Sequence, residues 1–492
     1  MQREFYYNSI STLSKDFKSY DIVIVGAGLS GLTAAFRLFQ LKPYLRIKIL
    51  EAKDRIGGRL YSTELPASAC SIDVWDLGGS WIGNKAIQPF INQLLADLSL
   101  SSYPQYFSGK KVLQAGKNSR ISFYDSKLPD IGLFSLWDTS QLMKNVDKAQ
   151  NSLFKTQTKN HELSDFYDSI TMETFIKQRV WSECTVDCAR AAFRATFGCE
   201  LDKISMLYAL TYFNSCGCLR NLIESSEDSC QGFKIVGGAQ RICTRILEII
   251  GPEVLELESV VSSISEDYNE KDERFSAVVT SNGDSYLAKH VVLSIPTQLI
   301  TNIQFQPPLS STKYEYFSSV SPGHIIKVIL TYETAFWKNS GFSGEIVTNG
   351  GISFTEGCST GPLTVVFDAT TPNMSPALMG IIGGKQAFEY EDKTKEERKE
   401  AVLRSLETFF GGNEVRNFIV YCEKVWRQEP FVGGCPVSHV PTGVGKYINQ
   451  ILRAPENQIH FAISELAQSW MGFMEGAVES GEKAALEIVS QY

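Results

Sequence analysis

The segment 21–59 constrains the fold of this chain more than any other. It holds an apolar run, three glycines spaced as Gly26, Gly28 and Gly31, an apolar helical pattern, and a second apolar run that ends at Glu51. The first glycine permits a tight turn, the second lets a pyrophosphate approach the backbone, and the third lets the helix pack closely on the strand. The helix N-terminus offers N–H groups to a phosphate, and Glu51 suits ribose hydroxyls. The segment predicts a dinucleotide-binding βαβ unit, with a chance glycine turn as the alternative.

Two further glycine-rich turns point to the same ligand. Arg59 follows two glycines just after the second predicted strand, where its guanidinium suits a pyrophosphate. A second turn holds Gly78, Gly79 and Ser80. An ordinary loop remains the alternative for this turn when it is taken alone.

The C-terminal part of the chain carries several more motifs in a fixed order. They are Trp426, Gly433-Gly434-Cys435, the segment 460–465 and the glycine-rich segment 470–482. Together with the N-terminal turns, these motifs resemble flavin-containing amine oxidases, and monoamine oxidases most closely. The resemblance extends from about residue 20 to residue 489 and implies FAD as the cofactor.

The resemblance also implies the architecture, which periodicity alone does not give. We expect an α/β fold in which a Rossmann-like FAD-binding domain is interleaved with an α+β substrate domain. The expected FAD-binding segments are 20–85, 231–296 and 426–492; the expected substrate-domain segments are 86–230 and 297–425, after a polar leader at 1–19. Apolar spacing predicts mainly helices in 86–230 and a long helix at the C-terminus.

Several cofactor contacts follow from the resemblance. It implies a thioether between Cys435 and the flavin, an aromatic contact of Trp426 with the flavin ring, and a bond from Glu465 to the sugar-phosphate part. The remaining expected FAD-binding positions are Val261, Gly472 and Met474. A core tryptophan and a free buried cysteine are the alternatives for Trp426 and Cys435.

The chain departs from the family pattern at several catalytic positions. Pro436 and Phe473 stand where monoamine oxidases place two tyrosines beside the substrate amine. Asn302 stands where the resemblance leads us to expect a lysine near the flavin, so we expect no positive charge there and slow reaction with oxygen. Ile463 replaces a glycine close to the cofactor.

Three more positions match the family's substrate cavity. Gln231 corresponds to a cavity glutamine, and Leu222 and Ile223 fall at its apolar gate. Ordinary packing is an equal alternative for all three.

Bulk properties exclude several other classes. The net charge of −8 comes without a long block of like charge, so we expect no nucleic-acid partner. The five histidines are dispersed, which argues against a metal site. Eleven scattered cysteines fit a reduced, cytoplasmic setting. No apolar stretch reaches about 18 residues, so we expect no transmembrane segment and a soluble protein.

The leading hypothesis is therefore an FAD-dependent amine oxidase. It would convert a small amine to an imine and then an aldehyde, with oxygen reduced to hydrogen peroxide. An L-amino-acid oxidase or a polyamine oxidase is the nearest alternative; an arginine in the cavity would favour the first and acids at its entrance the second. A flavin-binding scaffold or sensor without turnover is the other alternative. The sequence leaves open whether the chain forms a homodimer.

Overall fold

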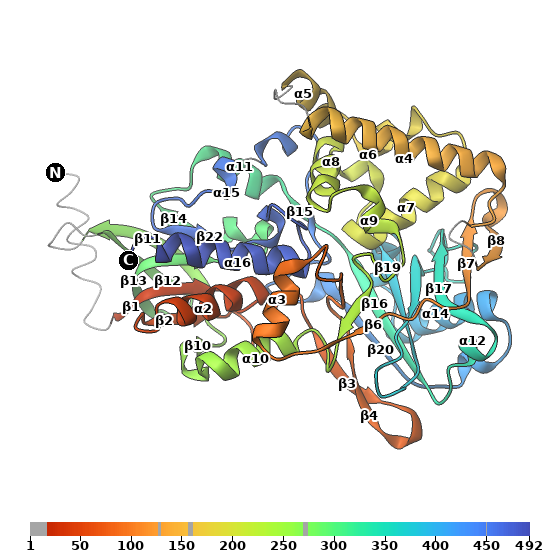
Figure 1. The fold of residues 1–492 in the computed structure, drawn as a ribbon, viewed down its shortest axis with the longest axis horizontal. Helices are drawn as coiled ribbons and strands as arrows, with labels where there is room; N and C mark the ends of the chain where they lie inside the picture. Colours follow the sequence, from red (N-terminus) through yellow and green to blue (C-terminus); the bar gives the residue numbers. More distant parts are fainter. Residues whose placement is uncertain (1–16, 126–128, 156–160, 269–273, 449) are drawn as a thin grey trace.

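The computed structural model describes residues 17–125, 129–155, 161–268, 274–448 and 450–492. Most of the expected polar leader lies outside these residues, and its last two residues already belong to the first strand. Figure 1 shows two lobes side by side, with strand β1 (Lys18–Val25) and the C-terminus in one of them.

The first lobe is built on an eight-stranded sheet with a parallel centre. In spatial order its strands are β10 (Leu255–Glu256), β2 (Ile47–Leu50), β1 (Lys18–Val25), β13 (Ser285–Leu293), β12 (Arg274–Thr280), β11 (Val261–Tyr268) and β14 (Gln304–Gln306), with β22 (Ile459–Phe461) also paired to β13. Strands β2, β1, β13 and β22 are parallel, which confirms the Rossmann-like expectation.

Side chains of β1 alternate between two apolar cores, because successive residues of a strand point to opposite faces. Ile22 and Ile24 pack with four helices, whereas Val23 and Val25 pack in the core on the other face. These four helices are α2 (Leu29–Leu41), α3 (Pro89–Asp97), α10 (Arg241–Ile250) and α16 (Met474–Val489). Helix α3 and strand β14 thus join this lobe, although both lie within segments predicted for the substrate domain.

The second lobe contains a seven-stranded, mainly antiparallel sheet. In spatial order its strands are β20 (Phe418–Val425), β16 (Ile325–Tyr332), β19 (Ala377–Gly383), β18 (Val365–Asp368), β17 (Phe342–Thr348), β7 (Lys110–Ala115) and β8 (Arg120–Tyr124). All eight residues of β16 are buried, so both faces of the sheet are covered.

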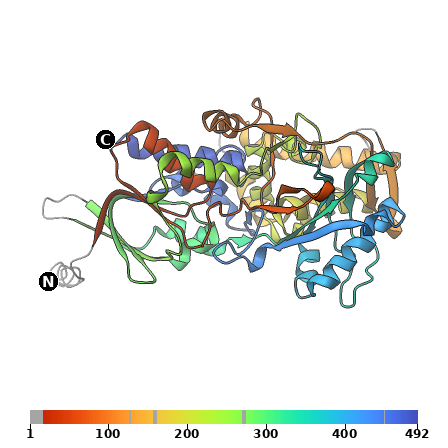
Figure 2. The same cartoon turned by 90° about the horizontal axis from the view of Figure 1, so that it is seen from below.

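Helices lie along both sides of this second sheet, as Figures 1 and 2 show. One group is α4 (Leu133–Phe154), α5 (His161–Ser169), α6 (Met172–Lys177), α7 (Glu183–Phe197), α8 (Met206–Ser215) and α9 (Leu219–Ile223). The other group is α12 (Phe336–Asn339), α13 (Lys385–Glu391) and α14 (Lys395–Phe410). The segment 86–230 is therefore mainly helical, as predicted, although it also contributes short strands.

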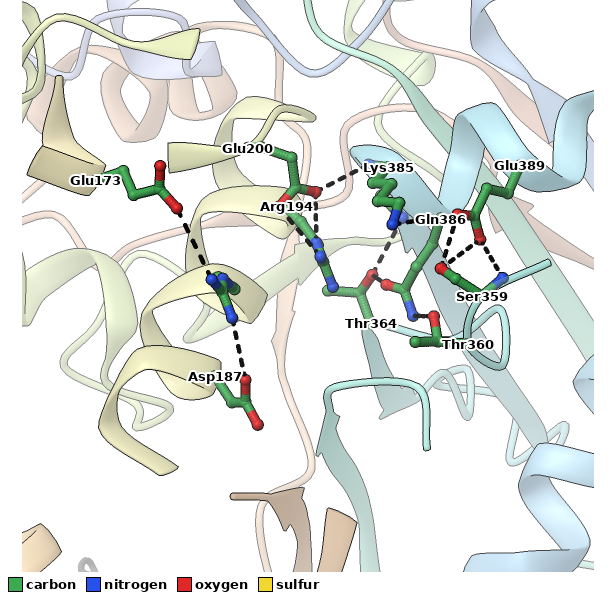
Figure 3. A network of polar contacts seen from close by, with 12 residues as sticks. Glu173, Asp187, Arg194, Glu200, Ser359, Thr360, Thr364, Lys385, Gln386 and Glu389 are labelled. Atoms are coloured by element: carbon green, nitrogen blue, oxygen red, sulfur yellow. Dashed lines mark hydrogen bonds and ion pairs between the residues drawn. The ribbon is translucent and has the colours of Figure 1, made fainter. Parts of the chain in front are cut away.

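Polar contacts join α7 to the first residue of α13, which follows strand β19 of the second sheet (Figure 3). Arg194 on α7 donates to Glu200 at 2.6 Å, and Glu200 accepts the backbone N–H of Lys385 at 2.9 Å. Because α7 also lines the central cavity described below, these contacts set the position of one cavity wall.

Shorter elements connect the lobes. They are β3 (Ser62–Pro66), β4 (Ile72–Asp76), β5 (Trp81–Ile82), β6 (Ser102–Pro104), β9 (Phe233–Ile235), α11 (Ser311–Ser319), β15 (Ser321–Pro322), β21 (Ser438–His439) and α15 (Gln450–Arg453). Strands β3 and β4 form a hairpin that projects from the body of the molecule (Figure 1).

Candidate active site

A single large cavity runs between the two lobes. Its volume is about 1420 Å³, which exceeds the ~300–1,000 Å³ typical of one ligand pocket, so it has room for a cofactor and a substrate together. The predicted site residues that line it are Gly26, Gly28, Glu51, Arg59, Gly78, Gly79, Ser80, Leu222, Ile223, Gln231, Val261, Asn302, Cys435, Pro436, Ile463, Gly472, Phe473 and Met474.

The glycine turn after β1 presents bare backbone to this cavity. Helix α2 has Gly28 at its N-cap without a side-chain cap, and Leu29 and Ser30 of its first turn line the cavity. A Cβ added at Gly28 would meet no atom within 4 Å, so this residue borders open space. A Cβ at Gly31 would lie 2.2 Å from the Gly26 carbonyl oxygen. The two glycines thus differ in role: Gly28 borders open space where a ligand can lie, and Gly31 lets helix and strand pack closely.

Glu51 closes this end of the cavity at the end of β2. Its carboxylate accepts the backbone N–H of Ala27 at 2.7 Å and that of Lys53 at 3.0 Å. Burial raises the pKa of Glu51 above its usual value, although these two hydrogen bonds act in the opposite direction. The carboxylate is therefore held at a fixed place beside the turn, where a ribose hydroxyl could donate to it.

Arg59 forms a bidentate ion pair with Glu465. Its guanidinium is therefore not left free for a pyrophosphate, as we expected from the sequence. Its two terminal nitrogens donate to the two oxygens of Glu465 at 2.6 and 3.0 Å. One of them also donates to the carbonyl oxygen of Pro436 at 2.9 Å. Burial raises the pKa of Glu465, but the charge and hydrogen bonds of Arg59 outweigh it and hold this pKa below its usual value. Glu465 does not line the cavity, and the pair joins the N-terminal and C-terminal motifs.

A buried lysine that we did not select from the sequence contacts the Gly78–Ser80 turn. Lys327 on β16 donates to the Gly78 carbonyl oxygen at 2.8 Å and to the Ser80 hydroxyl at 2.6 Å, and it lines the cavity. Burial lowers the pKa of Lys327 to about 8, so the ammonium form prevails at neutral pH. Lys327 thus brings a cation to the cavity wall at a position other than that of Asn302, and slow reaction with oxygen stays a prediction. The available signal was one lysine inside an otherwise apolar strand.

Cys435 lines the cavity as a buried free thiol. Burial raises the pKa of this thiol to about 12, while the charges of Arg59 and Lys327 work in the other direction. Trp426 lies behind the wall rather than on it: its indole N–H donates to the Leu77 carbonyl oxygen at 2.8 Å, and its side chain is fully buried. The expected direct contact of Trp426 with a flavin ring is thus not visible in the cavity lining.

The wall at the start of α16 is aromatic. The Phe473 ring lies 6.1 Å from that of Tyr212, a cavity residue on α8 that the sequence analysis missed. Burial raises the pKa of Tyr212, so it stays a neutral phenol. Gly472 is required here because a Cβ would lie 2.2 Å from a Val437 methyl group. Pro436 lines the same cavity, so the wall has two aromatic rings although Pro436 contributes none.

The residues present fit a flavin dinucleotide. An uncapped helix N-terminus, an open glycine position and a fixed carboxylate meet at one end of the cavity. A second uncapped N-terminus, that of α16, lies at Met474, which also lines the cavity. Within the described ranges there is no cluster of three or more His, Cys, Asp or Glu side chains that could hold a metal ion. No helix in the described part of the chain is long and apolar enough to cross a membrane.

Comparisons with known proteins agree with this site. The family model described as "Flavin containing amine oxidoreductase" matches residues 29–489. The chain is 30% identical to bovine amine oxidase [flavin-containing] B over 95% of its own length and 86% of that protein. It is 29% identical to a Dictyostelium discoideum protein described as "Probable flavin-containing monoamine oxidase A", over 95% and 97% of the two chains.

Solved structures give the same result. Cyclohexylamine oxidase from Brevibacterium oxydans IH-35A superposes with a TM-score of 0.86 at 26% identity, covering 96% of this chain and 99% of that one. Putrescine oxidase bound to putrescine superposes with a TM-score of 0.84 at 24% identity, covering 96% and 100%, which shows a shared fold.

Proposed function

The chain belongs to the family of flavin-containing amine oxidoreductases and is an FAD-dependent amine oxidase, and we propose that a neutral amine docks between the Phe473 wall and the cofactor. The observation that supports this most is one continuous cavity that joins a dinucleotide-binding turn to an aromatic chamber. The chemistry that FAD supplies when bound is two-electron oxidation of the C–H bond next to nitrogen, with oxygen as the final acceptor and hydrogen peroxide as its product.

The side chains of this chain orient the amine and exclude water. Phe473 and Tyr212 bring aromatic rings to this wall, and the face of an aromatic ring attracts the partly positive N–H hydrogens of an amine. The buried surroundings favour the neutral amine, because an ammonium would have to give up its hydration. This is the form with a nitrogen lone pair, which oxidation at the neighbouring carbon requires.

We propose that Lys327 and the N-terminus of α16 stabilise negative charge next to the flavin ring. Both face the cavity, and among the described residues Lys327 forms no ion pair with a carboxylate. A preorganised cation in a water-excluded site acts strongly on charge that develops during reaction. Lys327 also holds the Gly78–Ser80 turn in place through its two hydrogen bonds.

We propose that Cys435 carries the flavin as a thioether. The thiol is free, lines the cavity and lies in the field of two cations. Gly78, Gly79 and Val261, which are also expected to contact FAD, line the same cavity. The eleven free cysteines are those of a protein kept in a reducing compartment, and we propose the cytoplasm.

One spectroscopic experiment tests the proposed function. The purified holoprotein should be yellow with one FAD per chain, and anaerobic addition of a monoamine such as n-octylamine should bleach the flavin band. Admitting oxygen should restore the band and release hydrogen peroxide. A folded, flavin-loaded protein that no primary amine reduces would contradict the proposal.

A further inference from the structure

The wall that the second sheet contributes to the cavity carries a buried carboxylate. Glu345 on β17 is 8% exposed and lines the cavity. Its carboxylate contacts the Lys111 ammonium of the neighbouring strand β7 at 2.8 Å. Among the described residues, this is the only ion pair or hydrogen bond of that carboxylate. Because a carboxylate can accept about four hydrogen bonds, most of its capacity is unused.

Two residues next to this carboxylate line the same cavity. Tyr124 on β8 also lines the cavity, and burial followed by the charge of Glu345 raises the pKa of its phenol. Lys111 itself is a cavity residue. The pair therefore faces the interior instead of only fastening β7 to β17.

The register of the second sheet gives the distance from this carboxylate to the cofactor side. Lys327, which holds the Gly78–Ser80 turn, pairs with Ile381; Ile381 pairs with Val365, and Val365 with Val347 on β17. Three strand spacings of ~4.8 Å and one two-residue step along β17 separate Lys327 from Glu345 by about 16 Å. Subtracting ~3 Å for the hydrogen bond to the carboxylate leaves about 13 Å for the substrate chain.

The floor between the two ends is apolar. Ile381, Val365 and Val347 all line the cavity along this row. An extended chain advances about 1.2 Å per bond, so about ten bonds fit over this floor. Such a surface suits a run of methylene groups.

The charges lining the cavity favour a cation over a carboxylate at the far end. Glu224 and Glu227 also line it and form no ion pair within 4 Å in the described part of the chain. Of the two cavity-lining arginines, Arg59 is bound to Glu465, and Arg220 is solvent-exposed on α9. The lysines that line the cavity are Lys53 and Lys111, which pair with Glu429 and Glu345, and Lys327 beside the Gly78–Ser80 turn. Unpaired carboxylates beside mostly paired cations suit a second ammonium better than the carboxylate of an amino-acid substrate.

We propose that Glu345 binds the distal ammonium of a long linear diamine or polyamine whose other amine is oxidised at the flavin. The inference rests on the proposed amine oxidation and names its substrate class. The distal ammonium shares the carboxylate with Lys111, and the methylene chain lies on the row of Ile381, Val365 and Val347. Glu345 is thus a specificity-determining residue at the end of the cavity opposite the chemistry.

The test compares substrates that differ only in the second nitrogen. Steady-state kcat/KM is measured for n-octylamine and 1,8-diaminooctane, and for diamines from 1,4-diaminobutane to 1,10-diaminodecane. The wild type should prefer the diamine to its matched monoamine, with an optimum at eight to ten carbons. Glu345→Gln should lower kcat/KM for 1,8-diaminooctane by about 30-fold, mainly through KM, and change n-octylamine by less than about threefold.

Two further variants complete the experiment. Lys111→Met removes the competing cation and should raise kcat/KM for the diamine. Glu396→Gln, an exposed change on α14 with the same loss of charge, should leave both substrates unaffected. Equal losses on both substrates in Glu345→Gln would overturn the inference in favour of a purely structural pair. If neither monoamine nor diamine reduces the flavin, the proposed function itself fails.

Discussion

The two ends of the cavity are encoded in different ways. At the dinucleotide end, Gly26, Gly28 and Gly31 lie within six residues, and each is fixed by what the backbone must do. On the second sheet, Lys111 and Glu345 lie far apart in the sequence and meet only because β7 and β17 are neighbouring strands. The dinucleotide end can be recognised from a local sequence motif, whereas the arrangement on the second sheet appears only in the tertiary structure.

This difference explains why the cofactor could be inferred before the substrate. A turn that approaches a phosphate leaves few residue choices, because a side chain would occupy the ligand's place. A substrate wall tolerates many residue types, and its specificity depends on which side chains the sheet register aligns. The following predictions test the two ends separately.

The largest effect is expected at the dinucleotide end, from two substitutions three residues apart. Gly28→Val should fold normally but bind no FAD, because Gly28 has an extended backbone and its Cβ faces open space. Gly31→Val should fail to fold, because its Cβ would lie 2.2 Å from a backbone oxygen. FAD content and thermal unfolding separate the two outcomes. A yellow Gly28→Val protein would show that the turn does not hold the pyrophosphate.

The parts of the molecule that could be predicted from sequence follow the same division. The spacing correctly predicts the parallel strands and the close packing at Gly31, and it places Glu51 at the end of β2, where its contact with ribose stays a prediction. Trp426 and Glu465 do not line the cavity, so their expected contacts with FAD stay predictions. Tyr212 was missed because α8 is apolar around it and carries no local signal.

The second prediction concerns Lys327 on β16, beside the Gly78–Ser80 turn. Lys327→Met should slow reoxidation of the reduced flavin by about 100-fold and affect reduction by amine much less. Since burial lowers the pKa of Lys327 to about 8, the cation is present below this pH and is lost as the pH rises through it. Wild-type reoxidation should therefore slow above pH 8, and the variant should not show this dependence. Stopped-flow measurement of both half-reactions over pH 6–10 checks this. If the variant reoxidises with the same pH dependence as the wild type, Lys327 does not supply the charge.

A third prediction concerns the proposed thioether at Cys435. Cys435→Ala should lose any covalent adduct, so that acid precipitation leaves all flavin in the supernatant. Turnover should fall by less than about tenfold, because the turn, Glu51 and α16 still position the cofactor. Intact-mass measurement of the wild-type pellet gives the reference. A wild-type pellet without flavin mass would refute the thioether and leave the oxidase assignment untouched.

The smallest effect should come from Asn302→Lys. This substitution tests whether the cation beside the flavin belongs at position 302, as the sequence suggests, or at Lys327, as the structure indicates. If Asn302 marked a missing cation, the new lysine would accelerate reoxidation strongly. Lys327 already supplies an ammonium to the same cavity, and a second one would be repelled by it and would lower both pKa values. Reoxidation should therefore change by less than about threefold, whereas in a Lys327→Met background the same substitution should restore part of the lost rate. A large acceleration by Asn302→Lys alone would mean that the ammonium of Lys327 serves only to hold the Gly78–Ser80 turn.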